Sequence, residues 1–350
     1  MSTNRVKIAI RRKLRQYGLL RVKKSRSPLR WGIVGLGHMS EFFAQVIDDS
    51  YDNVVTAVAS RSIEKAKSFA SRHGAPRSYG RYIEMLTDDS IKLDVVYVAT
   101  PVKYHYEHVK MCLEAGQNVL CEKPITSNAA QLEELIVLAQ ERGCFLMEGM
   151  WMKCLPTYGK AHQWLNEGRI GALQMVKVDF YKREHIRPEL TIYNLKEGGG
   201  VLRDFGVYSI SMVVDFLCGQ PTSMTTQTLW SKYGIDADWQ IAAEKSGVKA
   251  CVSMSSRFGS LSKAALIGSE GTIEWESQFN RTNRVTLYNA EGVQIETFTA
   301  RYTHEGFEYE LTEVCNCIRS GERESAIVPL GASLDTMRTI DKLMTDSGDD

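Results

Sequence analysis

Apolar and polar positions alternate along the chain in two different ways. In the first 150 residues, short apolar runs are followed by segments in which apolar residues recur at helical spacing. This alternation of buried strands and amphipathic helices predicts a doubly wound parallel sheet with helices on both faces. The predicted strands cover 29–34, 54–59, 93–99, 118–121 and 144–147, and the predicted helices cover 38–47, 63–72, 103–115 and 127–142.

The second half is rich in strands that follow one another directly. Turn sequences such as Gly268-Ser269-Glu270-Gly271 separate them, which predicts a large, open and mostly antiparallel sheet in a second α/β domain. One helix at 201–217 interrupts the strands, and two helices at 305–319 and 330–344 end the chain. The predicted strands cover 175–181, 223–230, 240–243, 249–257, 262–267, 272–275, 284–288 and 293–298.

Composition is that of an ordinary globular protein of about two domains, with 350 residues of which 43% are apolar and 24% charged. No apolar run approaches the ~18 residues of a membrane span, and we expect no secretory signal. The eight cysteines form no C-x-x-C pair. We therefore expect no metal site, and free, mostly buried thiols in the cytoplasm.

Charge divides the chain unequally. Residues 1–30 contain eleven Lys and Arg and no acidic residue, whereas the remainder holds 32 basic and 42 acidic residues. The acidic body argues against nucleic-acid binding. We therefore delimit a basic extension at 1–28. It is interpreted as a solvated extension, a helix on the protein's own acidic surface, a polyanion or membrane contact, or an organelle transit peptide.

A glycine-rich turn follows the first predicted strand, in Trp31 to Ser40 (WGIVGLGHMS). Gly35 permits the tight turn, Gly37 allows close approach of a pyrophosphate, and Ser40 is the small residue where helix packs on strand. Backbone N–H groups of Gly37, His38 and Met39 would then face phosphate oxygens. This pattern predicts a dinucleotide-binding Rossmann domain at 29–150 and a substrate and oligomerisation domain at 151–328. A C-terminal helix at 329–350 is expected to pack back on the first domain.

The second predicted strand ends in Ser60 and Arg61, where an NAD-binding fold usually carries an acidic residue. A guanidinium suits the 2′-phosphate of NADP(H), and Lys65 lies one helical turn further on. We therefore expect NADP(H) as the preferred cofactor. The alternative is that Arg61 stacks on adenine and NAD(H) is also accepted.

Two further segments carry groups suited to acid–base chemistry. Lys123 follows a strand in CEKP, and Pro124 could fix the chain through a cis peptide bond. Nearby positive charge or desolvation would lower the pKa of Lys123. Three glycines at 198–200 precede a helix on which Asp204 and Tyr208 are four residues apart and share one face. From the sequence alone Lys123 could equally be a surface lysine in a loop. Without the other motifs, Asp204 would be read as an aspartate that stabilises its helix and Tyr208 as a core tyrosine.

From residue 29 to residue 344 the chain resembles the Gfo/Idh/MocA family of oxidoreductases. The resemblance rests on the segments GLGHMS, ASRS, ATPVKYH, CEKP, EGMWMKCLP, GGGVLRDFGVY and EYELTEVCNCIRSGERES. It implies a Rossmann domain, an open-sheet domain that often forms homodimers or homotetramers, and a catalytic Lys123 with Asp204 and Tyr208 in the pocket. It also implies cofactor contacts at Thr100, Pro101, His105, Glu122 and Lys123.

Tyr208, where many members have His, resembles the branch of dimeric dihydrodiol dehydrogenases, xylose dehydrogenases and some sugar-nucleotide ketoreductases. In that branch the tyrosine is the favoured acid/base and NADP(H) is usual. Lys153 stands where the branch often has Arg. The candidate substrate residues, which could also be core or surface positions, are Trp151, Lys153, Arg183, Arg187 and Tyr193.

The sequence thus predicts hydride transfer between nicotinamide and a secondary hydroxyl or ketone of a sugar, sugar nucleotide or cyclic diol. Tyr208 would move the hydroxyl proton, Lys123 would stabilise the oxyanion, and Asp204 would position them. The alternatives are an aryl-diol dehydrogenase, favoured by an apolar aromatic pocket, and a non-catalytic dinucleotide-binding regulator.

Overall fold

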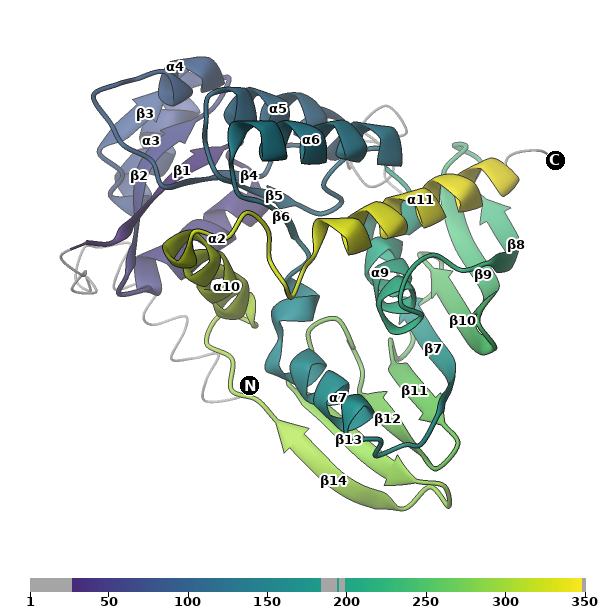
Figure 1. The fold of residues 1–350 in the computed structure, drawn as a ribbon. Helices are drawn as coiled ribbons and strands as arrows, with labels where there is room; N and C mark the ends of the chain where they lie inside the picture. The colour runs from purple at the N-terminus through teal and green to yellow at the C-terminus, as the bar shows by residue number, and fades with distance from the viewer. Residues whose placement is uncertain (1–26, 184–193, 195–198, 348–350) are drawn as a thin grey trace.

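A computed structural model describes residues 27–183, 194 and 199–347 (Figure 1). Residues 1–26 of the predicted basic extension lie outside the described residues, as do Arg187 and Tyr193. Among the described residues, no helix is long and apolar enough to cross a membrane.

The first sheet has six parallel strands in the order β3-β2-β1-β4-β5-β6, which confirms the predicted doubly wound sheet (Figure 1). Its central strands are apolar and fully buried, and this is why they stood out in the sequence. Strand β3 was not predicted, because its three residues are exposed or half-buried and form no apolar run. The strands are β1 (Leu29–Val34), β2 (Asn53–Ala59), β3 (Arg77–Tyr79), β4 (Val95–Val98), β5 (Val119–Glu122) and β6 (Leu146–Gly149).

Helices cover this sheet, with α5 and α6 packed side by side above it in the view of Figure 1 and α2 beneath it beside α10. Ser62 caps α3 as its sequence predicts, since its side chain accepts a hydrogen bond from Lys65 N. The helices are α2 (His38–Asp49), α3 (Ile63–His73), α4 (Tyr82–Leu86), α5 (His105–Glu114) and α6 (Ala129–Arg142), with the 3₁₀ helix η1 (Val102–Tyr104) before α5.

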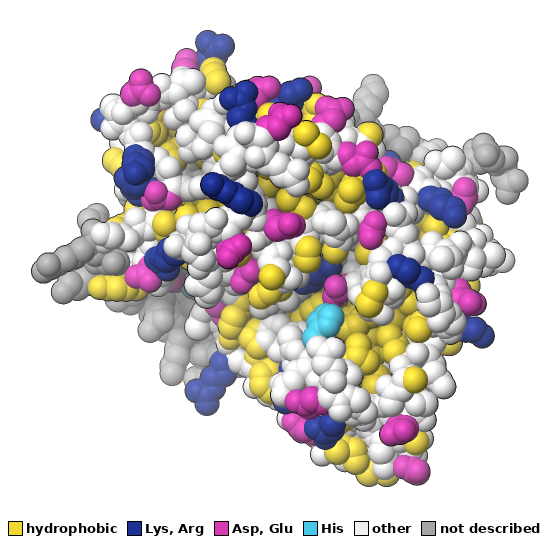
Figure 2. Space-filling model, in the orientation of Figure 1, with side chains coloured by type: hydrophobic (Ala, Val, Ile, Leu, Met, Phe, Trp, Pro, Cys, Tyr) yellow, Lys and Arg dark blue, Asp and Glu magenta, His cyan; other side chains and the backbone are white. Residues whose placement is uncertain are grey.

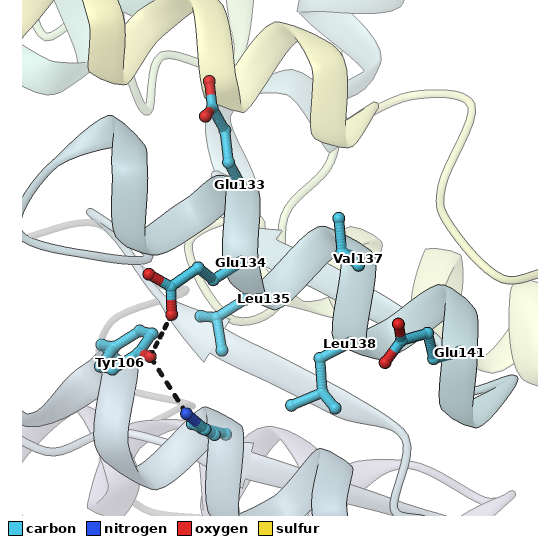
Figure 3. A pocket seen from close by; sticks show the side chains of 8 residues that line it. Tyr106, Glu133, Glu134, Leu135, Val137, Leu138 and Glu141 are labelled. Atoms are coloured by element: carbon cyan, nitrogen blue, oxygen red, sulfur yellow. Dashed lines mark hydrogen bonds between the residues drawn. The ribbon is translucent and has the colours of Figure 1, made fainter.

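An outer groove of about 370 Å³ lies between α5 and α6 (Figure 3). The hydroxyl of Tyr106 donates to Glu134 and accepts from Lys110, so the polar groups of the groove are partly satisfied among themselves. None of its lining residues is among the expected site residues. They are Tyr106, Lys110, Glu133, Glu134, Leu135, Val137, Leu138 and Glu141.

The second sheet has eight strands in the order β14-β13-β12-β11-β7-β10-β9-β8. Only β7 and β10 pair in parallel, so the expected open, mostly antiparallel sheet is confirmed. Helices α7 and α9 pack against it. Its strands are β7 (Leu173–Tyr181), β8 (Ser223–Trp230), β9 (Asp236–Lys245), β10 (Val248–Ser255), β11 (Ala264–Gly268), β12 (Gly271–Trp275), β13 (Arg284–Asn289) and β14 (Gln294–Thr299).

The single helix predicted at 201–217 was wrong in one respect. The chain forms α8 (Val201–Asp204) and α9 (Gly206–Phe216), with Phe205 between them at φ −109° and ψ −20°. A Cβ on Gly206 would lie 2.9 Å from both Met254 Sδ and Val201 O, so tertiary packing holds the chain tightly at this break. The 3₁₀ helix η2 (Trp151–Cys154) and α7 (Pro156–Asn166) were not predicted.

Two C-terminal helices return along the molecule, α10 (Phe307–Ser320) and α11 (Leu330–Asp346). Helix α11 packs on α6 of the first part of the chain and on α9 of the second (Figure 1). Asp341 accepts a hydrogen bond from Ala129 N at the start of α6, and Ser333 donates to Glu148 at the end of β6. One helix therefore ties the two sheets together.

All eight cysteines are free, as expected. Five are buried, whereas Cys218 and Cys251 are exposed. Figure 2 shows acidic and basic side chains intermixed on the face it presents, with no large basic patch among the described residues there.

Candidate active site

Lys123, Asp204 and Tyr208 come together in space although they lie on different elements. Lys123 directly follows β5, Asp204 ends α8, and Tyr208 lies in the first turn of α9. Lys123 Nζ is 2.5 Å from Asp204 O, 3.3 Å from Asp204 Oδ1 and 5.1 Å from the centre of the Tyr208 ring. The break at Phe205 means that Asp204 and Tyr208 are brought together by the turn between two helices rather than by one regular helix face.

The pKa of Lys123 is raised, which corrects the expectation that it would be lowered. Burial alone would lower it, but the carboxylate of Asp204, the nearby Tyr208 and Glu122, and the hydrogen bond to Asp204 outweigh that effect. Lys123 is therefore a permanent ammonium at neutral pH. Its side chain keeps 16% of its surface exposed, against 38% for Asp204, so the pair borders a solvent-accessible space.

Tyr208 is a buried phenol with a defined hydrogen-bond partner. Its side chain is 8% exposed, and its hydroxyl oxygen accepts a 2.9 Å hydrogen bond from Trp151 Nε1. Burial raises the pKa of Tyr208 to about 12, with Lys123 and the Trp151 hydrogen bond acting in the opposite direction. The group is thus protonated at neutral pH and beside a cation, as a proton donor requires.

Aromatic rings surround this phenol. Phe180 on β7 lies 6.3 Å from Tyr208 and 4.9 Å from Phe205, measured between ring centres. Trp151 stacks on Phe307 with ring centres 4.3 Å apart. Trp151 is only 5% exposed, so most of the ring is covered by protein rather than presented to a pocket.

Two other expected substrate residues are Lys153, which pairs with a different carboxylate from Lys123, and Arg183. The side chain of Lys153 is 2% exposed and its Nζ lies 3.7 Å from Asp215 Oδ1 on α9. Asp215 also accepts hydrogen bonds from Tyr158 and His162, so Lys153 belongs to a buried ionic cluster. Arg183 is exposed just beyond β7.

The glycine-rich turn leaves room for a dinucleotide. Gly35 has φ +84°, and a Cβ there would lie 2.5 Å from Thr100 Cγ2, so the fold itself requires glycine. At Gly37 a Cβ would meet nothing within 4 Å. No side chain caps the N-terminus of α2, which His38 and Met39 begin. An open cradle in front of an uncapped helix N-terminus fits a pyrophosphate.

Arg61 lines a hollow of about 390 Å³ at the ends of β2 and β3. Its guanidinium lies 5.8 Å from the Tyr104 ring, and Arg81 lines the same hollow. Sequence reasoning missed Arg81, because β3, which precedes it, carries no apolar signal. Lys65 is exposed on α3, and buried Ser60 accepts a hydrogen bond from Ser62 N. The hollow therefore presents two guanidinium groups where the adenosine end of a dinucleotide would lie in such a fold.

The remaining expected cofactor contacts divide between surface and interior. Pro101 is exposed and Thr100 is half-buried, with its hydroxyl 3.0 Å from His108 Nδ1. His105 is 1% exposed, and its ring nitrogens contact Pro124 O at 2.8 Å and Thr100 O at 2.6 Å. Burial lowers the pKa of His105 to about 4. His105 thus links the loop that contains Thr100 to the loop that contains Pro124.

Glu122 belongs to a group of buried carboxyls that the sequence did not reveal. Its carboxylate accepts a 2.5 Å hydrogen bond from Tyr97, and burial raises its pKa. Glu148 is bonded by Ile125 N and Ser333, and burial raises its pKa also. Glu310 is 0% exposed, and neither of its oxygens has a hydrogen-bond partner among the residues that the structure describes. The peptide bond between Lys123 and Pro124 is cis, as anticipated.

The described residues contain no group of three or more His, Cys, Asp or Glu side chains placed to hold a metal ion. The groups that meet at the Lys123 site are an ammonium, a carboxylate and a phenol.

Comparison with known proteins gives a consistent result. Residues 29–150 match the oxidoreductase family with an NAD-binding Rossmann fold, and residues 158–274 match the GFO/IDH/MocA C-terminal domain. The trans-1,2-dihydrobenzene-1,2-diol dehydrogenase of Xenopus tropicalis is 32% identical over 312 residues, covering 87% of this chain and 93% of the relative. The human enzyme of the same name is 29% identical over 313 residues, covering 87% of this chain and 92% of the relative.

Solved structures share the fold at lower identity. The 3-ketoreductase KijD10 of Actinomadura kijaniata, in complex with NADP and TDP-benzene, has a TM-score of 0.78 at 24% identity, over 92% of this chain and 98% of its own. Levoglucosan dehydrogenase, in complex with NADH and levoglucosan, has a TM-score of 0.81 at 16% identity, over 92% and 97%. The two family matches and the full-length similarity to the amphibian enzyme lead to one conclusion: the chain belongs to the Gfo/Idh/MocA family of oxidoreductases.

Proposed function

We propose that the protein is an NADP(H)-dependent dehydrogenase that transfers hydride between nicotinamide and a secondary hydroxyl or ketone carbon of a cyclic diol or sugar. The observation that carries this proposal is the convergence of Lys123, Asp204 and Tyr208. Lys123 extends from the carboxyl end of a central strand, and in open α/β sheets ligands bind at that edge. The glycine turn after β1 opens toward the same edge.

NADP(H), when bound, would supply or accept the hydride at its nicotinamide ring. In the reducing direction, Tyr208 donates its phenolic proton to the substrate oxygen. The Lys123 ammonium stabilises the negative charge that develops on that oxygen. Asp204 holds the ammonium in place through its carboxylate and its backbone carbonyl. Oxidation follows the same steps in reverse, with Tyr208 recovering the proton.

The choice of NADP(H) rests on the residues at the hollow beside β2. Gly35, Gly37, His38 and Met39 would hold the pyrophosphate, and Arg61 would hold the 2′-phosphate, with Arg81 beside it. No acidic residue lines the hollow as described. An acidic residue is the usual partner of the ribose hydroxyls of NAD, and the hollow lacks one. KijD10 was solved with NADP and levoglucosan dehydrogenase with NADH, so these structures do not favour one cofactor. The preference for NADP(H) is therefore argued from the chain's own arginines.

A cyclic vicinal diol is the substrate that the surroundings of Tyr208 favour. Phe180 and Phe205 place aromatic rings beside the phenol. Aromatic surface suits a flat carbocycle better than a sugar rich in hydroxyl groups. The relatives named trans-1,2-dihydrobenzene-1,2-diol dehydrogenase point the same way. A sugar or sugar nucleotide is the second candidate, on the strength of the ketoreductase and levoglucosan dehydrogenase folds.

We further propose a homodimer or homotetramer that forms through the eight-stranded sheet. Exposed apolar side chains on its edge strands, Leu229 and Trp230 on β8 and Ile295 on β14, support this assembly. Light scattering of the purified chain would give its mass. The eight free thiols favour a reducing compartment such as the cytoplasm, which fractionation would test.

The deciding experiment is an assay of NADP⁺ reduction with trans-dihydrodiols and, separately, with pyranoses and sugar nucleotides, each repeated with NAD⁺. We expect turnover with a diol and a preference for NADP⁺. Turnover only with sugars would move the substrate assignment to the second candidate. Cofactor binding without turnover on either panel in both directions would favour the non-catalytic regulator instead.

A further inference from the structure

The hydrogen bond between Trp151 and Tyr208 has a fixed direction. An indole Nε1–H can only donate, so at this 2.9 Å contact the Tyr208 oxygen must be the acceptor. The phenolic hydrogen therefore points away from Trp151. Tyr208 borders the Lys123–Asp204 pair, so this leaves the hydrogen available to a substrate oxygen at that pair.

The Trp151 ring is held from two sides. It stacks on Phe307 at 4.3 Å with an interplanar angle of 16°, and Phe307 in turn packs edge-on against Phe42 of α2. A Cβ on Gly306 would lie 3.5 Å from the Trp151 ring, which places the backbone before α10 close to the indole as well.

An ion pair also links the two elements that carry Trp151 and Tyr208. Lys153, two residues after Trp151, pairs with Asp215 at 3.7 Å, and Asp215 lies on α9, the helix that carries Tyr208. The ionic pair thus ties η2, which carries the indole, to α9, which carries the phenol.

We propose that Trp151 is a positioning residue for proton transfer by Tyr208, rather than a platform for the substrate. Its N–H fixes the Tyr208 oxygen as an acceptor, directs the hydroxyl hydrogen toward the substrate oxygen, and stabilises the phenolate that remains when that hydrogen leaves. This inference rests on the proposed function, since it assigns a role within that reaction. A hydrogen bond to an oxygen that becomes negative strengthens as the proton departs, so the contact favours the transition state over the ground state.

Other ionisable groups face the same phenol and set the background against which Trp151 acts. They are Lys123, whose Nζ is 5.1 Å from the ring centre, and the carboxyls of Glu122 and Asp204. Trp151→Phe leaves all three of these groups in the chain, so a packing control is needed before a change in the pH profile is attributed to the lost N–H.

The test uses Trp151→Phe in the full chain, which keeps an aromatic ring on Phe307 but removes the N–H together with the fused five-membered ring. We expect kcat to fall about tenfold. The apparent pKa in the pH profile for oxidation should rise by about one unit, because the phenolate loses one hydrogen bond to a charged group. In a Tyr208→Phe background, the same change should have almost no further effect on kcat. Equal losses in both backgrounds, or an unshifted pH profile, would overturn the inference.

A control variant separates packing from hydrogen bonding. Phe307→Leu removes the stacking partner and keeps the N–H, so it should lower thermal stability while leaving the pH profile where it is. If Phe307→Leu shifts the pH profile as Trp151→Phe does, the effect comes from packing and the assigned role is wrong.

A readout without substrate distinguishes this inference from the proposed function. In the ¹⁵N-labelled protein, the indole N–H resonance that Trp151→Phe removes should shift and exchange faster with solvent in Tyr208→Phe. If that resonance is unaffected, the hydrogen bond is not formed and the inference fails. If it responds but no substrate is turned over, the proposed function fails and so does the catalytic part of the inference, while the contact itself stands.

Discussion

Lys123 is held by Asp204 through two different atoms, the backbone carbonyl at 2.5 Å and the carboxylate oxygen Oδ1 at 3.3 Å from Nζ. The carbonyl belongs to the last residue of α8, where the helix dipole is negative. The ammonium is thus fixed by main chain as well as side chain, and its position depends on the break between α8 and α9. Without the Asp204 carboxylate, Lys123 would keep its hydrogen bond to the Asp204 carbonyl. Without the Lys123 ammonium, the site would lose this positive charge altogether.

Replacing Lys123 by Met should therefore lower kcat by about 10²–10³-fold, the loss seen when a single stabilising donor is removed from a developing oxyanion. Cofactor affinity should change little, because the phosphate cradle is formed by other residues. Steady-state kinetics and NADPH fluorescence titration measure the two quantities. Lys177→Met, an exposed lysine on β7, is the matched control. Turnover near that of the wild type in Lys123→Met would refute the assigned role.

Replacing Tyr208 by Phe should reduce the rate by about 10²–10⁴-fold, because the proton donor is lost while the ring is retained. Since the pKa of Tyr208 is raised to about 12, the phenol is protonated across the neutral range. Any rise in the oxidation rate at high pH that comes from phenolate should vanish in this variant. A pH–rate profile that keeps the wild-type shape would show that another group moves the proton.

Replacing Arg61 by Ala should weaken NADPH binding by about 10–100-fold, the value of one charge-assisted hydrogen bond. NADH affinity should change much less, because it lacks the 2′-phosphate. Arg81→Ala, at the same hollow, shows whether the second guanidinium contributes. Equal losses for the two cofactors, measured by fluorescence titration, would indicate that Arg61 stacks on the adenine instead.

The first sheet could be predicted from the sequence because its strands are buried on both faces and form unbroken apolar runs. Strand β3 could not, since its residues Arg77–Tyr79 have no buried apolar position. Two residues of the candidate site could be predicted from local sequence as well: Gly35 has a positive φ in a tight turn, and Lys123 directly follows a buried strand.

Charge state and burial depend on contacts between distant parts of the chain, and these could not be predicted from the sequence. Met254 from β10 packs against Gly206 just after the break at Phe205. The raised pKa of Lys123 depends on the carboxylate of Asp204, which is 81 residues away in the sequence. The sequence suggested Lys153 as a substrate residue. In the structure it pairs with Asp215 on α9, and the local sequence around Lys153 does not predict that pair. Local pattern predicts which residues carry chemistry, whereas tertiary contacts decide their charge and exposure.

The cluster around Asp215 predicts a large effect on stability. Asp215→Ala would leave Lys153, 2% exposed, without its counter-charge, and Tyr158 and His162 without their acceptor. Breaking a buried pair from one side costs about 3–5 kcal/mol of unfolding free energy. Arg338→Ala breaks an exposed pair with Glu133 and should cost about 0–1 kcal/mol. Similar urea midpoints for the two variants would show that the Lys153–Asp215 pair contributes little.

Glu310 predicts how stability changes with pH. Burial raises its pKa well above the usual value, with the neighbouring Glu122 and Glu148 acting in the same direction. Below about pH 4.3 the carboxyl is protonated in both folded and unfolded chains. Above that pH the unfolded chain releases the proton and the folded chain keeps it, so the unfolded state binds fewer protons and stability falls as pH rises. The loss continues until the pH reaches the raised folded pKa.

Glu310→Gln removes this titration without removing the side chain's volume. The unfolding free energy of the variant minus that of the wild type should therefore rise with pH, by up to about 1.4 kcal/mol per unit above pH 5. Urea denaturation at several pH values between 5 and 8 measures this difference. Because Glu122 and Glu148 titrate in both proteins, the difference isolates Glu310. Parallel curves for Glu310→Gln and the wild type would mean that the buried carboxyl is ionised in the folded protein.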